Sequence, residues 1–319
     1  MNIVRRGARI EPMRVILFGG SEVWKTSSLA CAERALWADF HGSTATLTEQ
    51  PDCLFHPRTG RPKLYADLQD DLRELATDQR CRKEWDWLML DGLDDVERLY
   101  LVPEALRRAG TTTLGENYGK ACDALVQLHG EFLLLVDEVW RAGYSVGMTC
   151  HEQRVERVNP DGANYMATEM NLFYQAGKVG KWNCPQIWRD WVDACVYLTT
   201  EGRKVAKGEK DKIGKARGDV DKHVAYLGCE AWLDSAKARR CESLESPLAI
   251  SSPGDFWQRL TGTWKSSFDI AGLERRRAEV RALAEAAQVK NPEKLFAAVA
   301  TARSAHDLEK IAASLQKKE

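Results

Sequence analysis

The chain has 319 residues, enough for one large domain or for one domain with a tail, and its balance of 44% hydrophobic and 29% charged residues is typical of a globular protein. Its formal net charge of −1 excludes a global field that would attract nucleic acid or a membrane, so any such partner needs a local basic patch. Apolar runs stay short of the ~18 residues of a membrane span, and residues 1–13 lack the apolar core of a secretory signal. We therefore expect a cytoplasmic protein without a membrane partner.

The nine cysteines are scattered along the chain and odd in number. None of them forms a C-x-x-C pair, so the sequence favours neither a zinc site nor a disulfide framework. Reduced thiols in a cytosol are the expectation.

Strand and helix patterns alternate along the chain. An apolar strand is predicted at 14–20, a helix at 25–40 and a short β-rich run at 44–50. Further helices are predicted at 64–79 and 119–143, and further strands at 84–95, 144–153, 190–200 and 223–229. This alternation predicts an α/β fold with a mostly parallel sheet covered by helices on both faces.

Two regions depart from the alternation. Residues 203–222 hold eight Lys or Arg against four Asp or Glu and almost no large apolar side chain, which indicates a mobile surface loop or hairpin tip. From about residue 273 the chain is rich in Ala, Leu, Glu and Arg, and Pro292 marks the start of a second helix. We predict an N-terminal extension at 1–13, a core at 14–258 and a small helical tail at 273–319.

The first strand leads into a phosphate-binding loop pattern. The stretch FGGSEVWKTS matches G-x-x-x-x-G-K-[ST] except for one glycine, and it lies between a strand and a helix. Lys25 would bind the β- and γ-phosphates, Thr26 would place its hydroxyl on Mg²⁺, and the glycines would allow the tight turn. The predicted ATP-binding residues are Gly19, Gly20, Ser21, Glu22, Val23, Trp24, Lys25, Thr26 and Ser27.

Trp24 stands where the pattern has its second glycine. A tryptophan there adds bulk, and it adds strain on the order of 1–3 kcal/mol if the position needs a positive φ. The sequence thus leaves open whether the loop supports nucleotide turnover or only nucleotide binding.

Three further residues are candidates for the chemistry at such a loop. Asp91 ends an apolar strand, the arrangement in which a carboxylate meets Mg²⁺ beside the phosphate loop. Glu49 is a candidate for the base that polarises the attacking water, and His151, at a strand end, for a γ-phosphate sensor. A surface glutamate and a structural histidine are the alternatives at these two positions.

Basic residues near the end of the core could contact phosphates. The segment 203–222 either contacts a DNA backbone or is a solvated loop. Its candidate DNA contacts are Lys204, Lys207, Lys210, Lys212, Lys215 and Arg217. Lys237, Arg239 and Arg240 form a run that could reach a phosphate of their own or of a neighbouring subunit, as arginine fingers do, or could simply be solvated.

Over roughly residues 14–250 the order of these motifs resembles phage-encoded RecA-like nucleotide-binding proteins of the AAA class, the Sak-type single-strand annealing recombinases. The resemblance rests most on Tyr118–Lys120 before the long helix, on the strand ending in His151, and on AKARR followed by SPL. Here AKARR stands in place of the more usual AKNR, and the loop departs from the usual Pro-Gly type.

The resemblance implies a RecA-like P-loop ATPase core that uses ATP and Mg²⁺. By the resemblance, Lys25, Thr26 and Asp91 match nucleotide and Mg²⁺ positions, Glu49 the catalytic glutamate and His151 the γ-phosphate sensor. It also implies homologous recombination with single-stranded DNA and a single-strand-binding protein, self-association as a ring or filament, and the cytoplasm of a phage host.

Three other functions stay open on the sequence. One is a nucleotide-binding switch or structural partner that does not hydrolyse, which Trp24 favours. The second is a small-molecule or nucleotide kinase, although its lid would usually carry several arginines, whereas 203–222 has mostly lysines. The third is a plain DNA-binding module, which would leave the Lys25-Thr26 pair without a role.

Overall fold

The protein is described here from a computed structural model, which divides into two compact units. One comprises Pro12–Arg239 and Ser246–Gln258; the other comprises Met1–Glu11, Arg240–Glu245 and Arg259–Glu319. The structure describes residues 11–55, 60, 62–157, 163–175, 182–201, 204–206, 215–217, 222–230, 232–233, 235–241, 243–268, 270–286, 295–296, 298–299, 308–309 and 311–313.

The larger unit is built on one sheet whose central strands are parallel. The strand order is β14-β12-β9-β1-β5-β4-β2-β3, and every neighbouring pair from β9 to β3 is parallel. These strands are β1 (Arg14–Gly19), β2 (Ala35–Asp39), β3 (Asp52–Phe55), β4 (Trp87–Asp91), β5 (Ser145–Arg157) and β9 (Ala194–Glu201). Strand β5 separates β1 from β4, so the predicted loop strand and the predicted Asp91 strand are not direct neighbours.

Antiparallel strands extend the sheet. They are β6 (Tyr165–Met170), β12 (Lys222–Tyr226), β13 (Lys237–Ala238) and β14 (Leu248–Ile250). Two small pairs lie apart from it: β7 (Tyr174–Gln175) with β8 (Trp182–Asn183), and β10 (Lys204–Ala206) with β11 (Lys215–Arg217). The antiparallel β10–β11 pair agrees with the hairpin expected within 203–222.

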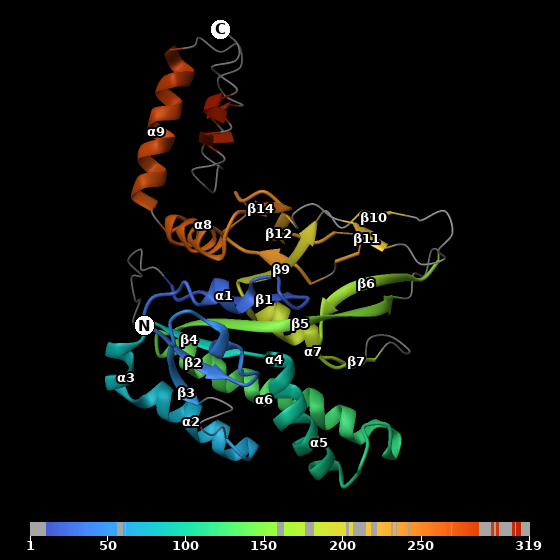
Figure 1. The fold of residues 1–319 in the computed structure, drawn as a ribbon. Coiled ribbons are helices and arrows are strands. Elements are labelled where there is room, and N and C mark those ends of the chain that lie inside the picture. The colour runs from blue at the N-terminus through green and yellow to red at the C-terminus, as the bar shows by residue number, and fades with distance from the viewer. Residues whose placement is uncertain are drawn as a thin grey trace. The chain divides into compact units, whose positions relative to one another are not determined.

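Helices cover the sheet, and Figure 1 shows α2, α5 and α6 together on one side of it. The helices of this unit are α1 (Lys25–Leu29), α2 (Tyr65–Thr77), α3 (Gln79–Glu84), α4 (Leu93–Val96), α5 (Val102–Ala109), α6 (Lys120–Arg141) and α7 (Cys184–Trp191). Short 3₁₀ turns lie at η1 (Ser43–Thr46) and η3 (Asn117–Gly119), and one π-helical turn at η2 (Glu97–Leu101). On the opposite face, Leu29 of α1 packs over Gly147 of β5.

The core follows from these patterns. Leu68, Leu72 and Leu75 of α2 recur at helical spacing and are buried against the sheet with Leu125 and Phe132 of α6. Strands β1 and β4 are apolar along almost their whole length, as strands covered on both faces are.

Two local predictions at 25–50 are wrong. The predicted helix at 25–40 ends at Leu29, and residues 35–39 form strand β2 instead. The Ala-rich stretch ACAER favours helix by propensity, but Trp37 and its neighbours are buried between β3 and β4, and this packing overrides propensity. The predicted β-rich run at 44–50 is turn and 3₁₀ structure around η1.

The smaller unit contains the helix α9 (Ile270–Ala286), and α8 (Pro253–Ser266) begins in the larger unit. Val280 of α9 is buried with Val299, Leu308 and Ala312, which is the apolar cluster of the tail. None of the helices within the described residues is long and apolar enough to cross a membrane.

Candidate nucleotide-binding site

The turn after β1 has the backbone shape of a phosphate-binding loop. Gly19 adopts a φ of 152°, and a Cβ at that position would lie 2.1 Å from the carbonyl oxygen of Leu198 on β9. A side chain cannot fit there, so glycine is required. Further along, Glu22 and Trp24 have φ values of 65° and 69°, and α1 begins directly after Trp24.

Trp24 holds the left-handed conformation that the missing glycine would adopt without cost. For a non-glycine residue this conformation costs on the order of 1–2 kcal/mol. The indole stacks on the imidazole of His223 from β12, with ring centroids 3.4 Å apart and planes 14° from parallel. Stacking of aromatic rings contributes about 0.5–1.5 kcal/mol, which offsets much of the backbone strain.

Lys25 points back into the loop. Its Nζ donates hydrogen bonds to the carbonyl oxygens of Gly19 at 3.0 Å and Gly20 at 2.5 Å. Burial lowers the pKa of the ammonium, while the acidic groups Asp94 and Asp91 oppose that shift. The negative charge of an anionic ligand would offset the free-energy cost of burying this cation.

Asp91, at the end of β4, is buried and lies among hydroxyl groups. Its Oδ1 accepts hydrogen bonds from Thr26 Oγ1 at 3.1 Å and Thr149 Oγ1 at 2.6 Å, and its Oδ2 accepts one from the Ser43 hydroxyl. Burial raises the pKa of Asp91, and these hydroxyl donors oppose the shift. Hydroxyl and carboxylate oxygens are hard ligands that suit Mg²⁺, so Thr26 and Asp91 fit the role of magnesium ligands.

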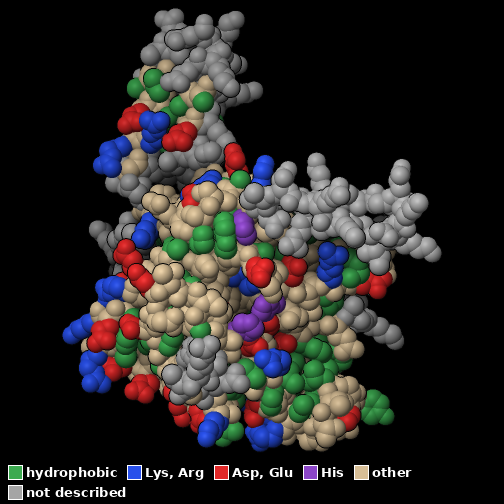
Figure 2. Space-filling model, viewed as in Figure 1, with side chains coloured by type: hydrophobic (Ala, Val, Ile, Leu, Met, Phe, Trp, Pro, Cys, Tyr) green, Lys and Arg blue, Asp and Glu red, His purple; other side chains and the backbone are tan. Residues whose placement is uncertain are grey.

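These groups border one cavity of about 300 Å³ at the carboxyl ends of the parallel strands. Figure 2 shows histidine side chains gathered beside acidic and basic ones on this face of the molecule. The cavity is lined by Ser21, Glu22, Val23, Trp24, Lys25, Thr26, Ser27, His41, Ser43, Thr46, Asp91, Gly92, Thr149 and His151. Of the predicted catalytic residues, the structure thus brings together Lys25, Asp91 and His151.

His151 lies at the cavity and is held by a carboxylate on α4. Its Nδ1 lies 2.9 Å from Asp94 Oδ2, and its backbone N–H donates to Asp94 Oδ1 at 3.2 Å. The hydrogen bond to Asp94 raises the pKa of His151, although partial burial opposes the shift. The imidazolium form is therefore favoured close to the place that a phosphate would occupy.

A second histidine, His41, lines the cavity beside the first. Its Nδ1 lies 2.9 Å from Asp95 Oδ2, and its ring centroid lies 5.5 Å from that of His151 in an edge-to-face arrangement. Asp39, at the end of β2, is occupied otherwise, because it accepts hydrogen bonds from the backbone N–H groups of His41, Gly42 and Thr44.

Sequence reasoning missed His41, Ser43, Asp94 and Asp95. Residues 35–39, ALWAD, form an apolar run that ends in an acid, which is the same pattern that indicated Asp91. This strand pattern, and with it His41 and Ser43, was missed because the predicted helix continued through residue 40. Asp94 and Asp95 were visible only as the acids after β4, and their partners come from distant strands.

Glu49 is not brought to the cavity. It is exposed in the turn after η1 and does not line the site. Glu49 was expected at the end of the second strand because that strand was predicted at 44–50. The second strand of the structure is β2, at 35–39.

The late basic residues have separate positions. Lys237 lies in β13 beside Cys195 of β9, and burial lowers its pKa to about 8. Arg239 donates from its backbone to the carbonyl of Asp193, and Arg240 belongs to the smaller unit, where its guanidinium lies 4.3 Å from the ring centre of Phe268.

The predicted DNA contacts fall partly outside the described residues. The backbone places Lys204, Lys215 and Arg217 on the β10–β11 pair, whereas Lys207, Lys210 and Lys212 lie outside the described part of the chain.

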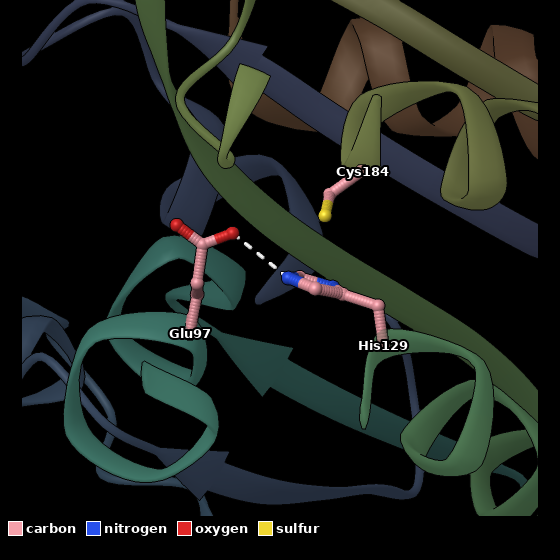
Figure 3. A group of neighbouring side chains, drawn as sticks. All are labelled: Glu97, His129 and Cys184. Atoms are coloured by element: carbon pink, nitrogen blue, oxygen red, sulfur yellow. Dashed lines mark hydrogen bonds and ion pairs between the residues drawn. The ribbon is translucent and has the colours of Figure 1, made fainter. Parts of the chain in front are cut away.

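Glu97, His129 and Cys184 form a second cluster whose spacing could suit a metal ion (Figure 3). His129 Nδ1, however, accepts a hydrogen bond from the indole N–H of Trp188 at 3.0 Å. Because an indole only donates, the ring proton must sit on Nε2, where it is donated to Glu97 at 2.8 Å.

A metal at this cluster would need the His129 Nε2 lone pair and a Cys184 thiolate. The Trp188 contact removes the first, and burial disfavours the second by raising the pKa of the thiol. Glu97 also accepts the backbone N–H of Phe173 at 2.7 Å. We therefore interpret the cluster as a structural hydrogen-bond network joining η2, α6 and α7.

Comparison with protein-family models finds no match to this chain, and no curated protein sequence matches it. Among solved structures, a KaiC-like protein from the hyperthermophilic archaeon Pyrococcus horikoshii is similar over 77% of this chain and 88% of that chain. The sequence identity is 13% and the TM-score 0.33. The strand order confirms the predicted α/β fold with a mostly parallel sheet.

Proposed function

We propose that the chain binds ATP with Mg²⁺ in this cavity and hydrolyses it. The observation that carries the proposal is the convergence of Lys25, Thr26 and Asp91 at the carboxyl ends of the parallel strands β1 and β4, which flank β5. Lys25 supplies the cation for the β- and γ-phosphates, and Thr26 with Asp91 supplies oxygen ligands for the metal. His151 lines the same cavity, and the pKa raised by its hydrogen bond to Asp94 favours a cationic ring, which suits a γ-phosphate.

A nucleotide-binding protein without turnover is the second candidate, and one observation favours it. Trp24 keeps the loop in shape at a strained position and places an indole at the cavity wall. A bulky ring there limits how closely the backbone can approach a phosphate. Hydrolysis therefore needs a direct test, in addition to binding.

We further propose single-stranded DNA as the partner that stimulates hydrolysis, in phage homologous recombination or strand annealing. The support is the resemblance of the motif order to Sak-type recombinases and the basic composition of 203–222. The same resemblance supports a ring or filament of identical chains and contact with a single-strand-binding protein. In such an assembly Lys237 and Arg239 are candidates for phosphate contacts to a neighbouring chain.

The test measures MgATP hydrolysis with and without single-stranded DNA, on the wild-type chain and the Trp24→Gly variant side by side. Turnover by the wild-type chain that DNA accelerates supports the recombination ATPase. Turnover by the glycine variant alone supports the non-hydrolysing role. If neither protein releases phosphate with DNA present, the ATPase proposal fails.

The kinase alternative predicts a different product. A kinase would transfer the γ-phosphate to a small molecule, so adding nucleosides or nucleoside monophosphates would accelerate ADP formation without release of inorganic phosphate. The proposed ATPase releases phosphate in proportion to ADP.

A further inference from the structure

His41 lines the cavity and has no role yet in the proposed hydrolysis. It follows the end of β2 by two residues and borders the same cavity as Lys25 and Asp91. Its side chain is 53% exposed, so a water molecule can reach the ring.

The carboxylate behind His41 fixes its tautomer. Asp95 is only 5% exposed, and its Oδ1 is paired with the guanidinium of Arg98 at 2.5 Å. A carboxylate in such an ion pair accepts hydrogen bonds, so Nδ1 of His41 donates to its Oδ2 across the 2.9 Å contact. In the neutral imidazole, Nε2 then carries the lone pair, as in a histidine that acts as a base against a buried aspartate.

Three aspartates at or near the cavity, Asp39, Asp91 and Asp94, are already engaged. Asp39 accepts three backbone N–H groups, Asp91 accepts hydroxyl groups, and both oxygens of Asp94 bind His151. Glu152, the next residue on β5, does not line the cavity, and its Oε2 is buried without a hydrogen-bond partner.

Glu22 is the remaining carboxylate of the cavity lining. It is exposed on the loop at a φ of 65°, and no contact described in the structure fixes its side chain. An unoriented carboxylate is a poorer base than an imidazole held by a buried partner.

We propose that His41 is the general base of the hydrolysis and that Asp95 is the residue that positions it. The inference rests on the proposed ATPase function. The oxygen of a water molecule attacks the γ-phosphorus while His41 Nε2 takes a proton from that water. The bond from the γ-phosphorus to the β–γ bridging oxygen breaks, and ADP leaves with the electron pair.

The charged groups around His41 fit a division in which Lys25 and His151 bind the phosphate and His41 acts on the water. On α4 and η2 it faces Asp95, Arg98 and Asp94; on β5, His151; and across the cavity, Lys25 and Asp91. His151 is the histidine favoured as a cation and Lys25 lies on the loop, so both suit the phosphate charge. His41 is left to accept the proton of the attacking water.

The experiment is single-turnover MgATP hydrolysis by the wild-type chain and by His41→Ala, Glu22→Gln and Glu49→Gln, with ATP affinity measured by calorimetry for each. We expect His41→Ala to lower the rate about 100-fold with affinity changed less than threefold, Glu22→Gln to lower the rate much less than His41→Ala does, and Glu49→Gln to stay within threefold of wild type. Added imidazole should restore part of the His41→Ala rate, which a purely structural role would not allow.

Asp95→Asn tests positioning. We expect a drop in kcat of about tenfold with little change in KM, together with a displaced acid limb of the pH–rate profile. A His41→Ala rate within threefold of wild type, or a comparable loss in Glu22→Gln or Glu49→Gln alone, overturns the assignment while leaving the ATPase standing. A wild-type chain that binds MgATP without turnover overturns both proposals.

Discussion

The two sides of the cavity are built in different ways. The loop side consists of backbone in unusual conformations and one buried ammonium, Lys25. The opposite side consists of Asp91 at the end of β4 and of two carboxylates on α4, Asp94 and Asp95, which hold histidine rings through Nδ1. The first side suits the charge of a nucleotide, and the second suits a metal ion and the movement of protons.

Because of this difference, the two sides of the cavity should respond differently to side-chain substitutions. The loop keeps its backbone shape with Trp24 in place of glycine, because the stack on His223 offsets much of the strain. Buried carboxylates survive only while their partners remain, because an unpaired buried charge is costly. Substitutions on the loop side should therefore change affinity, and those on the carboxylate side should change both stability and pH dependence.

The largest effect is expected on the loop side, from Lys25→Ala. Losing a charge-assisted contact to phosphate costs about 1.5–3 kcal/mol, which is roughly a 10- to 150-fold loss of ATP affinity. Fluorescence titration with a labelled ATP analogue measures it. Lys120→Ala, an exposed lysine outside the cavity, is the control and should bind like the wild-type chain. An unchanged affinity in Lys25→Ala would contradict the assigned loop.

On the carboxylate side, Asp91→Asn should separate stability from function. The pKa of Asp91 is raised in the folded state, so this acid lowers the stability of the fold as the pH rises above the ordinary value of 3.8. The amide can donate to the hydroxyls of Thr26, Ser43 and Thr149, because hydroxyl groups also accept. We expect the nucleotide-free variant to be more stable by about 1 kcal/mol in urea unfolding, and to lose the stabilisation by MgATP.

Asp39→Asn is the matched comparison for that variant. It is an equally buried acid beside Asp91 on the next strand, but its partners include three backbone N–H groups, which only donate. An amide nitrogen there would face a donor, so this variant should be less stable than wild type. Equal changes in the unfolding free energy of Asp91→Asn and Asp39→Asn would contradict this difference between hydroxyl partners and backbone N–H partners.

Trp24 permits a test of strain against stacking within the loop. Trp24→Ala loses the His223 stack and keeps the left-handed backbone strain, whereas Trp24→Gly loses the stack and relieves the strain. The glycine variant should be more stable than the alanine variant by about 1–2 kcal/mol in denaturant unfolding. If the two variants unfold at the same denaturant concentration, the loop does not hold residue 24 at positive φ in solution.

The smallest effect is expected from the His151–Asp94 pair. A histidine with a raised pKa adds stability that is fully present below about pH 6.5 and is lost as the pH rises through its folded-state value. Because the side chain of His151 is about one-third exposed, the contribution is on the order of 0.5–1 kcal/mol. Asp94→Asn should reduce the difference in unfolding free energy between pH 6 and pH 9. If the difference is not reduced, groups other than this pair cause the pH dependence of stability.

Much of the core could be predicted from local pattern. The strands around Val15 and Leu88 and the helix containing Leu125 are long, strongly periodic or fully apolar, and they appear where the pattern puts them. Strand β2 could not be predicted in this way. Its five residues follow an Ala-rich stretch, and only pairing with β3 and β4 makes them extended.

The same limit applies to the candidate site. Lys25, Thr26 and Asp91 belong to motifs that can be recognised along the chain. The pairs His41–Asp95 and His151–Asp94 each join residues more than 50 positions apart, so only the folded sheet edge shows them. Losing β2 from the prediction also moved the expected base from the end of that strand to Glu49.

The most direct test of the central claim is a calorimetric titration of the wild-type chain with ATP, in Mg²⁺ and again with the metal chelated. The account predicts saturable binding of one ATP per chain, weakened about tenfold or more without Mg²⁺ because Thr26 and Asp91 then lack the metal that links them to the phosphates. Absence of binding, or binding of equal strength in both conditions, would contradict a magnesium-nucleotide site at the end of β1.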